Sequence, residues 1–208
     1  MSEPPYAQPL RESDVQADPV AQFATWFEAA QAADIRQPEA VAVATATADG
    51  APSVRMVLMK SFDEDGFVFF TNYDSRKGAE LAANPRAALL FHWEALGRQV
   101  RIEGAARPVA RAESERYVRS RPRASQISAL ASPQSEVVAS REALEARVAE
   151  LAGRYRDSDP PIPDRWGGFR VSPEQFEFWQ HREDRLHDRL RYTRDGARGA
   201  WRIERLAP

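Results

Sequence analysis

The sequence predicts a mainly β protein with helices (α+β), built as an antiparallel barrel with peripheral helices. The predicted elements run in the order helix, five strands, helices and a closing set of strands, without the strand–helix alternation of a parallel sheet. The turns between the first strands are acidic and end in glycine, which is typical of antiparallel hairpins. The chain has 208 residues, of which 43% are hydrophobic. This length and composition suit one compact domain with a sizeable core.

The N-terminal residues 1–17 are polar and contain several prolines, and we expect a flexible arm that is mobile unless something binds it. Residues 18–208 form the single predicted domain. Its first helix begins at Asp18-Pro19, because Asp is a favoured N-cap and Pro a favoured first helical residue. Core-facing residues then recur at helical spacing: Phe23, Trp26, Phe27 and Ala30.

β-Branched and aromatic runs predict the five strands that follow. Three of them are joined by turns that end at Gly50 and Gly66, and lie at residues 40–47, 53–62 and 67–72. The other two are joined by a turn from Glu94 to Gly97, and lie at residues 86–93 and 98–107. Between the two sets we expect a short helix from about Ser75 to Ala83, because Asn84-Pro85 ends it.

Helical spacing predicts three helices in the second half of the chain, at residues 109–121, 125–131 and 140–156. Pro122 separates the first two. Ser140 caps the third, whose apolar stripe is Leu144, Val148, Leu151 and Tyr155. A proline-rich loop leads into four short closing strands, near residues 168–172, 174–180, 186–193 and 200–206.

Several classes of chemistry are excluded by the residues that the chain lacks. It has no cysteine, which excludes disulfides, zinc–thiolate sites, iron–sulfur clusters and a cysteine nucleophile. Neither G-x-G-x-x-G nor a Gly-Lys pair occurs, so the Rossmann fingerprint and the Walker loop are both absent. The three histidines have no zinc-type spacing, and we expect no metal. No apolar run approaches the about 20 residues that span a bilayer, and we expect a cytoplasmic protein without membrane contact.

Positive charge is concentrated in two stretches, although the whole chain has a net charge of -2. Residues 101–125 hold seven arginines against three glutamates, and residues 181–208 hold eight arginines against five acidic residues. Solvated helix faces or an anion site would explain them, whereas a sequence pI near 6.0 argues against a nucleic-acid surface. Of the 29 cationic residues only Lys60 and Lys77 are lysine. A genomic bias toward arginine would explain this ratio, and the alternative is that a guanidinium fork does not fit at these two positions.

Two candidate anion sites lie at predicted helix starts. Tyr117 and Arg121 share a helical face, and Ser125 is a plausible cap of the next helix beyond Pro122. Asp74-Ser75-Arg76-Lys77 places two cations at the start of another helix. Free N–H groups and the positive end of the dipole favour phosphate at such places. Ordinary caps with solvated arginines remain the alternative explanation.

Two further cationic patterns lie on predicted strands. Strand alternation puts Arg55 and Lys60 on opposite faces of an apolar strand. The same alternation puts Arg185, His187 and Arg189 on one face, a cationic row that would repel itself unless an anion lies against it.

Together these residues resemble the FMN-dependent pyridoxine/pyridoxamine 5'-phosphate oxidase family over roughly residues 19–208. The matching blocks are RMVLMK (55–60), FFTN (69–72), SRK (75–77), RQV (98–100), Y-x3-RPRASQISALAS (117–132), PQS (133–135), WGGFRV (166–171), FEFWQ (176–180), RLHDR (185–189) and WRIERLAP (201–208). Their combined spacing is far more specific than any single block, and RLHDR is the most diagnostic.

The resemblance implies an antiparallel split β-barrel of Greek-key type, forming a homodimer that holds FMN between its subunits. It implies flavin contacts at Arg55, Met56, Val57, Leu58, Met59, Lys60, Phe70, Thr71, Arg76, Lys77, Gln99, Gln134, Ser135, Trp179 and Arg189. It implies that the substrate phosphate is held by Lys60, Tyr117, Arg121 and Ser125. Arg185, Leu186 and His187 would close over the substrate ring, with Arg185 and His187 as the catalytic residues.

This sequence departs from the family pattern in two places. The N-terminal arm lacks the adjacent basic pair found before a tyrosine in some members, leaving only Tyr6 and Arg11 for a lid contact. His181-Arg182 replaces what is often a glycine-containing turn.

The implied reaction is the oxidation of pyridoxamine or pyridoxine 5'-phosphate to pyridoxal 5'-phosphate, with O2 as acceptor and H2O2 as product. Two alternatives remain open. One is a related flavin oxidase that acts on another aromatic metabolite, as in phenazine-pathway relatives. The other is a non-enzymatic protein that binds flavin or nucleic acid, which only the arginine-rich stretches suggest.

Overall fold

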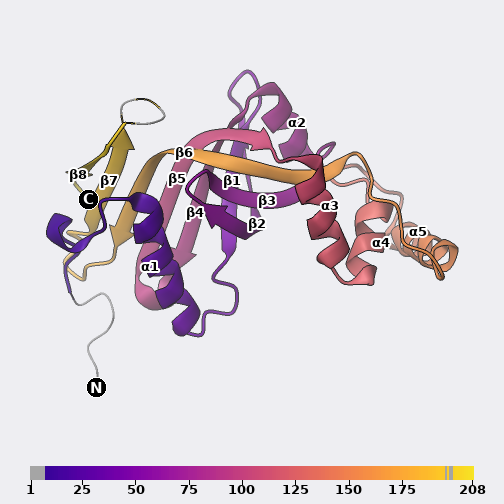
Figure 1. Cartoon of the computed structure of the whole chain (residues 1–208), viewed down its shortest axis with the longest axis horizontal. Helices are drawn as coiled ribbons and strands as arrows, with labels where there is room; N and C mark the ends of the chain where they lie inside the picture. The colour runs from indigo at the N-terminus through magenta and orange to yellow at the C-terminus, as the bar shows by residue number, and fades with distance from the viewer. Residues whose placement is uncertain (1–7, 195, 197–198) are drawn as a thin grey trace.

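Six antiparallel strands close into a barrel, and two more strands extend the same sheet beyond it (Figure 1). The structure, a computed structural model, describes residues 8–194, 196 and 199–208. The strand order is β3-β2-β1-β4-β5-β6-β7-β8, and β3 also pairs with β6 to close the barrel. Because β4 returns to lie beside β1 after the β1–β2–β3 meander, the arrangement is a Greek key. The predicted antiparallel barrel with peripheral helices is confirmed.

The elements follow the chain in the predicted order. The strands are β1 (Ala40–Ala46), β2 (Pro52–Asp63), β3 (Gly66–Asn72), β4 (Arg86–Trp93), β5 (Arg98–Pro108), β6 (Trp166–Gln180), β7 (Asp188–Arg194) and β8 (Trp201–Arg205). The helices are α1 (Pro19–Ala32), α2 (Arg76–Ala83), α3 (Arg111–Ser120), α4 (Arg123–Ala131) and α5 (Arg141–Arg154), with short 3-10 turns at Glu12–Asp14 and Glu94–Leu96. No helix among the described residues is long and apolar enough to cross a bilayer.

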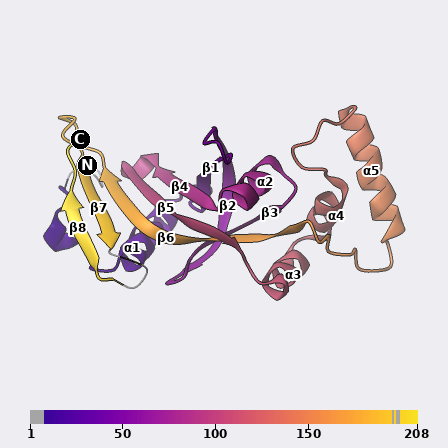
Figure 2. The ribbon, with the colours of Figure 1, turned by 90° about the horizontal axis from the view of Figure 1, so that it is seen from above.

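The closing strands differ from the prediction at one place. The segments predicted at 168–172 and 174–180 form one long strand, β6, which spans much of the molecule (Figure 2). Pro173 lies opposite Gly104, where the pairing of β6 with β5 shifts register. A proline interrupts a strand only if its missing N–H removes a regular ladder bond, and at this irregularity it does not. The beginning of β6 therefore pairs with β3, and its end pairs with β7.

The core is a cluster of aromatic rings between α1 and the inner face of the barrel. Phe23 of α1 makes edge-to-face contacts with Phe62, Phe67 and Phe91, at centroid distances of 4.9, 4.8 and 4.9 Å. Edge-to-face pairs are favourable because the positive ring edge meets the negative ring face. The stripe predicted on the first helix is thus confirmed, and α1 covers one end of the barrel.

Residues 8–17, the described part of the predicted arm, are held against the C-terminal strands. The Leu10 N–H donates to Asp188 Oδ2 (3.0 Å), and the Arg205 guanidinium binds both Leu10 O (2.8 Å) and Glu12 Oε2 (2.8 Å). Tyr192 adds a hydrogen bond from its hydroxyl to Gln16 O (2.8 Å). Tyr6, considered for a lid contact, lies outside the described residues.

Helices α4 and α5 form a separate lobe at the end of the molecule opposite β7 and β8 (Figure 2). Its small core consists of Ile127, Ala131 and Leu151. The proline-rich loop that follows α5 is fastened by arginines at its backbone carbonyls: Arg111 binds Ile162 O (3.0 Å), Arg119 binds Pro160 O (2.9 Å) and Arg123 binds Ser158 O (2.7 Å). Much of the predicted arginine-rich stretch therefore serves the fold.

Candidate functional site

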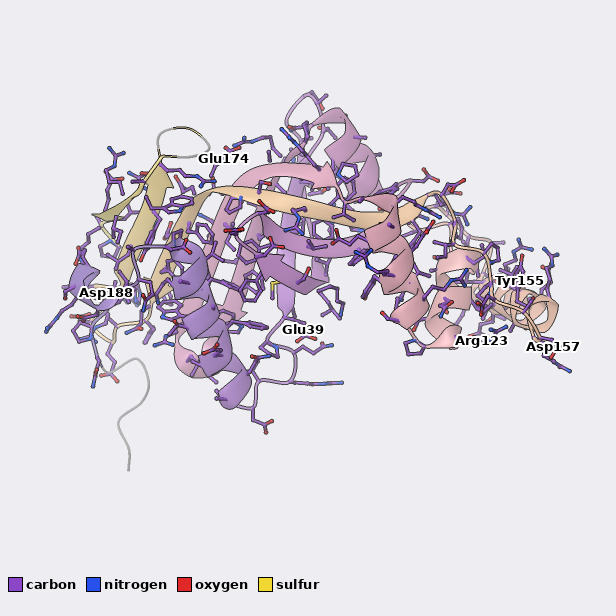
Figure 3. All side chains as sticks on the ribbon, in the orientation of Figure 1. Glu39, Arg123, Tyr155, Asp157, Glu174 and Asp188 are labelled. Carbon is purple, nitrogen blue, oxygen red and sulfur yellow. The ribbon has the colours of Figure 1, made fainter. Side chains whose placement is uncertain are left out.

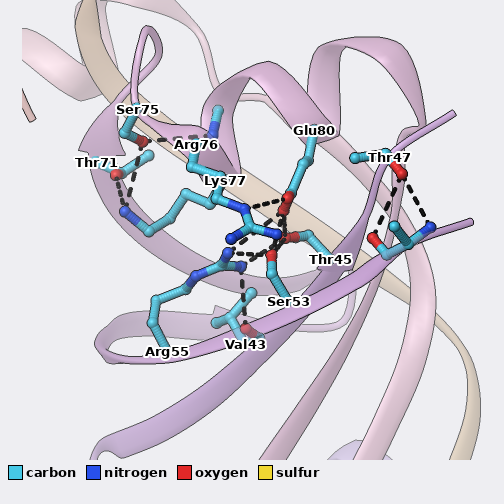
Figure 4. Close-up of polar contacts among 12 residues, drawn as sticks. Val43, Thr45, Thr47, Ser53, Arg55, Thr71, Ser75, Arg76, Lys77 and Glu80 are labelled. Carbon is cyan, nitrogen blue, oxygen red and sulfur yellow. Dashed lines mark hydrogen bonds and ion pairs between the residues drawn. The ribbon is translucent and has the colours of Figure 1, made fainter. Parts of the chain in front are cut away.

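Arg55 and Glu80 form the centre of a polar network between β2 and α2 (Figure 4). The Arg55 guanidinium donates to Thr45 Oγ1 (2.5 Å) and Val43 O (3.3 Å), and pairs with Glu80 Oε2 at 3.3 Å. Glu80, only 4% exposed, also accepts hydrogen bonds from the hydroxyls of Ser53 and Thr45. Arg76 completes the network through its Nε, 2.8 Å from Glu80 Oε1.

Lys77 lies beside this network, 8% exposed. Its Nζ donates to Thr71 Oγ1 (3.0 Å) and to Gln134 Oε1 (2.9 Å), with Ser75 Oγ at 3.5 Å. We call Arg55, Thr71, Arg76, Lys77 and Gln134 the lysine cluster. All five were predicted as cofactor contacts, and the structure brings them together from β2, β3, α2 and the loop after α4.

The charges of the lysine cluster do not balance. Three cations, Arg55, Arg76 and Lys77, face the single carboxylate of Glu80. Among the described residues no carboxylate lies within 4 Å of Lys77 Nζ, whose partners are all neutral oxygens. Burial lowers the pKa of the Lys77 ammonium, and nearby Arg55 lowers it further. A bound anion would supply the missing negative charge, so the cluster suits a phosphate.

Local sequence explains how α2 presents these cations. Ser75 is the N-cap, accepting from Gly78 N (3.4 Å), so Arg76 and Lys77 occupy the first turn. Gly78 packs directly on the backbone of Tyr73, where a Cβ would lie 2.0 Å from Tyr73 O. Only glycine permits this approach, which brings the positive helix end close to β3.

A second group combines aromatic rings with one arginine. We call Phe70, Tyr117 and Trp166 the aromatic stack: Phe70 and Tyr117 are 3.9 Å apart at an interplanar angle of 16°, and Trp166 is 6.0 Å from Tyr117 at 7°. The Arg121 guanidinium carbon lies 5.2 Å from the Trp166 ring centroid and 6.0 Å from that of Tyr117. Burial raises the pKa of the Tyr117 hydroxyl, although Arg121 opposes the shift. The predicted pair Tyr117 and Arg121 is therefore assembled.

Two expectations about the neighbouring loops need correction or comment. Ser125 does not cap α4, because the helix begins at Arg123 with Pro122 as its N-cap residue. Ser125 instead lies inside the first turn, since α3 and α4 are separated by a shorter break than predicted. Ser135, beside Gln134, has a φ of 76°. Its left-handed conformation is uncommon for serine and is often found at functional loops.

The RMVLMK segment of β2 divides between two faces. Met59 is buried in the barrel core and Val57 packs against that core, so their side chains are committed to packing. Met56 is 64% exposed on the opposite face, and Leu58 follows it there by strand alternation. Lys60 is exposed where the pairing of β2 with β3 shifts register between Met59 and Ser61. This bulge lies beside the Met59–Phe69 pair, next to Phe70 of the aromatic stack.

A third group, which we call the tryptophan row, crosses the outer face of the sheet. Gln99 of β5 pairs in register with Trp179 of β6, which pairs with Arg189 of β7. These three residues were predicted as cofactor contacts. Arg189 also binds Glu177 Oε1 through its Nε at 2.7 Å and Ala207 O through a second nitrogen at 2.7 Å.

The predicted cationic row on one strand face is wrong. Strand β7 begins at Asp188, so Arg185 and His187 lie in the preceding loop, where Arg185 has a φ of 62°. Arg189 alone is on the strand, and Glu177 neutralises it. No bound anion is required to explain the sequence RLHDR, because tertiary pairing separates its charges.

The loop nevertheless places His187 against the tryptophan row. Its ring centroid is 4.7 Å from that of Trp179 and 5.3 Å from that of His181. The backbone N–H of Arg182 donates to His187 Nδ1 at 3.0 Å. Because a backbone N–H can only donate, neutral His187 carries its ring proton on Nε2. Leu186 beside it is 67% exposed.

The lysine cluster and the tryptophan row are far apart on one chain. Thr71 lies opposite Gly167 and Arg189 lies opposite Trp179, both on β6. At about 3.3 Å per residue, the separation along that strand is on the order of 40 Å. Figure 3 shows Asp188, the neighbour of Arg189 in the chain, at one end of the molecule. No single mononucleotide can touch both groups of one chain.

Two residues of the site escaped prediction from the sequence. Glu80 balances part of the lysine cluster, and its spacing of four from Arg76 is a helical ion-pair signal that could have identified it. Trp166 lies in a matching block but has no role until the fold places it behind Tyr117.

Comparison with known proteins covers nearly the whole chain. Residues 27–155 match the family described as "Pyridoxamine 5'-phosphate oxidase", and residues 166–208 match "Pyridoxine 5'-phosphate oxidase C-terminal dimerisation region". The chain is 56% identical over 200 residues to the pyridoxine/pyridoxamine 5'-phosphate oxidase of Burkholderia vietnamiensis, covering 96% of this chain and 93% of the relative. It is 53% identical over 207 residues to a chloroplastic pyridoxine/pyridoxamine 5'-phosphate oxidase of Arabidopsis thaliana, covering 98% of this chain and 39% of that protein.

Solved structures share the fold. PhzG from Burkholderia lata, in complex with tetrahydrophenazine-1-carboxylic acid, superposes with a TM-score of 0.90 and 36% identity, covering 98% of this chain and all of that one (100%). An FMN-binding protein from Nostoc punctiforme, related to pyridoxamine 5'-phosphate oxidase, has a TM-score of 0.69 at 18% identity and covers 90% of this chain and 96% of that one.

The buried carboxylate of Glu80 generates a prediction about acid stability. Burial raises its pKa, but hydrogen bonds from Ser53, Thr45, Arg76 and Arg55 outweigh burial and lower the pKa from 4.5 to about 2. A group whose pKa is lower in the folded state stabilises the fold above its unfolded pKa and loses that contribution as the pH falls. The stability advantage of the wild type over Glu80→Gln should therefore shrink by about 2 kcal/mol between about pH 6 and pH 3.

Urea unfolding of the two proteins at both pH values measures this change. Glu145→Gln is the matched control, because Glu145 makes the same kind of i,i+4 pair with Arg141 but is 60% exposed. The Glu145→Gln substitution should change the free energy of unfolding by less than about 0.5 kcal/mol at either pH. An advantage over Glu80→Gln that does not vary with pH would contradict the assigned ionisation of Glu80.

Proposed function

Since the chain belongs to the pyridoxamine 5'-phosphate oxidase family and is an oxidoreductase, we propose that it oxidises pyridoxamine or pyridoxine 5'-phosphate to pyridoxal 5'-phosphate. FMN would be the cofactor, and O2 the electron acceptor that yields H2O2. The observation that carries the proposal is the presence of two separate cationic sites. One has three cations against the single carboxylate of Glu80, and in the other Arg121 has no ion pair among the described residues. One suits the phosphate of a flavin nucleotide and the other suits the phosphate of a small substrate.

The lysine cluster fits the phosphate of FMN by the chemistry of its donors. It offers a buried ammonium, two guanidinium groups and the hydroxyl of Thr71, against one carboxylate. Such mixed charged and neutral donors are typical of phosphate sites. Arg55, Thr71, Arg76, Lys77 and Gln134 would therefore hold the phosphate end.

The flavin ring would lie against other predicted contacts. These contacts would be the backbone groups of residues 56–60 on β2, the side chain of Phe70 on β3, and Ser135, which follows Gln134 in the chain. When bound, FMN would supply the acceptor for a hydride from the exocyclic carbon of the substrate. With the amine substrate, the resulting imine would be hydrolysed to the aldehyde and ammonia.

Arg121 and its neighbours would hold the substrate phosphate. Tyr117 presents its hydroxyl from the aromatic stack, and Ser125 lies in the first turn of α4, near the positive end of that helix. Lys60 would approach from the bulge of β2. A phosphate held from several sides fixes the pyridine ring in one orientation, which is a large part of the catalytic task.

Arg185, Leu186 and His187 would close over the substrate ring. Because His187 Nδ1 accepts the Arg182 N–H, Nε2 of neutral His187 is the hydrogen-bond donor. The contact with Trp179 would set the orientation of the ring. This donor would orient a polar ring substituent rather than remove a proton. Arg185 would add positive charge from the same loop.

The active form would be a homodimer in which each FMN touches both chains. The lysine cluster of one chain would meet the tryptophan row of its partner, because about 40 Å of β6 separates the two groups within a chain. The outer face of β2 and β4 is apolar and uncovered by helices, with Val54 67%, Met56 64% and Leu90 37% exposed. Such a face is typical of an interface.

A second candidate function is the oxidation of a different aromatic metabolite. The likeness to PhzG, at 36% identity and a TM-score of 0.90, favours it. A substrate without phosphate would leave Arg121 and Lys60 unpaired, which argues for the phosphorylated substrates.

The direct test is an aerobic assay of FMN-loaded protein with both phosphorylated substrates. We expect aldehyde formation with equimolar H2O2.

Lys60→Ala should weaken the apparent affinity for the substrate about 10- to 150-fold, since a charge-assisted contact to phosphate is lost. Arg116→Ala, an exposed arginine in the same cationic stretch, is the control and should change it less than about 2-fold. Turnover of a phenazine precursor in place of both substrates would favour the second candidate.

Hybrid dimers test the shared site. The Lys77→Ala and Trp179→Ala variants should each lose FMN. In each homodimer both sites then lack a contact, either Lys77 of the lysine cluster or Trp179 of the tryptophan row. When the two variants are unfolded together and refolded as a mixture, half of the dimers are hybrids, and each hybrid regains one intact site. FMN content should therefore recover to about a quarter of the sites. No recovery, in a mixture shown to contain hybrids, would mean that each site belongs to one chain.

The loop before β7 and the strand itself should have separable roles. Arg185→Ala or His187→Ala should retain FMN while slowing reduction of the flavin by substrate on the order of 100-fold, because orientation of the ring is lost. Arg189→Ala should instead weaken FMN retention. Anaerobic bleaching of the flavin and FMN retention on gel filtration measure the two effects. Loss of FMN from the Arg185 and His187 variants, with normal reduction after reloading, would reverse the roles.

A further inference from the structure

Arg121 is held differently from the arginines around it. The guanidinium groups of Arg111, Arg119 and Arg123 donate hydrogen bonds to backbone carbonyls of the loop at 157–165. For Arg121, no side-chain hydrogen bond or ion pair occurs within the part of the chain that the structure describes. Its contacts are instead with ring faces, at 5.2 Å from Trp166 and 6.0 Å from Tyr117.

A guanidinium packed through its face keeps its donors available. All five N–H groups of arginine lie in the plane of the group and point outward, whereas aromatic rings contact the plane from above. The ring quadrupole attracts the cation without consuming a hydrogen bond, and tryptophan does so more strongly than the other rings. A cation–π contact of this kind can hold Arg121 without using its N–H donors, which stay available to an anion.

The surrounding structure fixes Trp166 itself. It is 7% exposed, and its backbone N–H donates to Pro163 O at 3.0 Å. As the first residue of β6 it pairs in register with Asn72. Its ring is parallel to both Tyr117 and Phe70, at interplanar angles of 7° and 10°. One rigid tryptophan thus supports a ring and a cation that both belong to the predicted phosphate site.

We propose that Trp166 is a positioning residue for the substrate phosphate, acting by holding the face of Arg121 so that the guanidinium edge meets the phosphate. The inference rests on the proposed function, since it takes the anion at Arg121 to be the substrate phosphate. Trp166 would touch neither the substrate nor the flavin. Its contribution is to affinity and to discrimination between phosphorylated and unphosphorylated ligands.

A double-mutant cycle on the FMN-loaded protein tests this role. The probes are 4-deoxypyridoxine 5'-phosphate and 4-deoxypyridoxine, which lack the oxidisable group, and their affinities are measured by equilibrium dialysis. Trp166→Leu should weaken binding of the phosphorylated probe about 3- to 10-fold and leave the unphosphorylated probe within about 2-fold. Trp166→Phe, which keeps a ring face, should stay within about 2-fold for both probes.

The decisive comparison is made in an Arg121→Ala background. Arg121→Ala alone should weaken the phosphorylated probe about 10- to 150-fold, and adding Trp166→Leu should then cost less than about 2-fold. Trp201→Leu is the control for loss of a tryptophan–arginine contact, because the half-buried Trp201 of β8 has the Arg194 guanidinium carbon 4.4 Å from its ring centroid. It should leave the ratio of the two affinities unchanged. If Trp166→Leu does not fold, Trp166→Met takes its place, since methionine fills irregular space.

The outcomes separate the inference from the proposed function. A wild type that does not prefer the phosphorylated probe overturns the phosphate site, and the role of Trp166 with it. A preference that Arg121→Ala abolishes and the Trp166 variant retains overturns the inference alone. Equal losses for both probes, or an undiminished loss in the Arg121→Ala background, also overturn it, because they show a general structural effect.

Discussion

The pairing of one long strand with three partners is the constraint on which the rest of the structure depends. β6 closes the barrel against β3, pairs with β5 from Phe169 to Gln180, and carries β7 and β8 at its far end. The same strand therefore begins at the aromatic stack and ends at the tryptophan row. Because a strand is a stiff spacer, the two groups cannot approach each other within one chain. On our proposal that one FMN touches both groups, a second subunit must supply one of them. The irregularity at Pro173 allows β6 to remain continuous.

Two cations, Lys77 and Arg121, are held in place without a carboxylate partner among the described residues. Lys77 is surrounded by neutral oxygens, and Arg121 by ring faces. A carboxylate at either position would hold the cation equally well but would compete with a phosphate for it. Other arginines are paired with carboxylates: Arg205 with Glu12 and Asp188, but also Arg55 and Arg76 with Glu80 and Arg189 with Glu177, three arginines that we propose contact FMN. An ion pair therefore does not by itself separate structural arginines from those that we propose contact a ligand.

The N-terminal segment and the loop before β7 share an anchor. Asp188 accepts the Leu10 N–H and one nitrogen of Arg205, and it is the residue that directly follows His187. The carboxylate thus fixes the point at which the loop enters β7, while the Arg182 N–H fixes the His187 ring. Two hydrogen-bonded attachments define the end of a loop that is otherwise exposed at Leu186. This combination suits a segment that must reach a ligand and still return to one geometry.

The sequence by itself determined the order of the elements and the antiparallel turns, because these depend on local patterns: alternation, caps and glycine turns. The members of the lysine cluster were predicted from the resemblance to a known family, through blocks such as RMVLMK, SRK and PQS. The sequence could not decide that 168–180 is one strand or that α4 begins before Ser125. Nor could it decide that Arg185 and His187 lie outside the strand. Bulges and loop ends are set by pairing with β5, β3 and the N-terminal segment, which are distant in the chain. Nor could it identify Glu80 and Trp166 as parts of the site. Their roles arise only when residues distant in the chain are brought into contact. Burial makes an unpaired charge costly, which explains the role of Glu80, and strengthens the attraction between a ring face and a cation, which explains the role of Trp166.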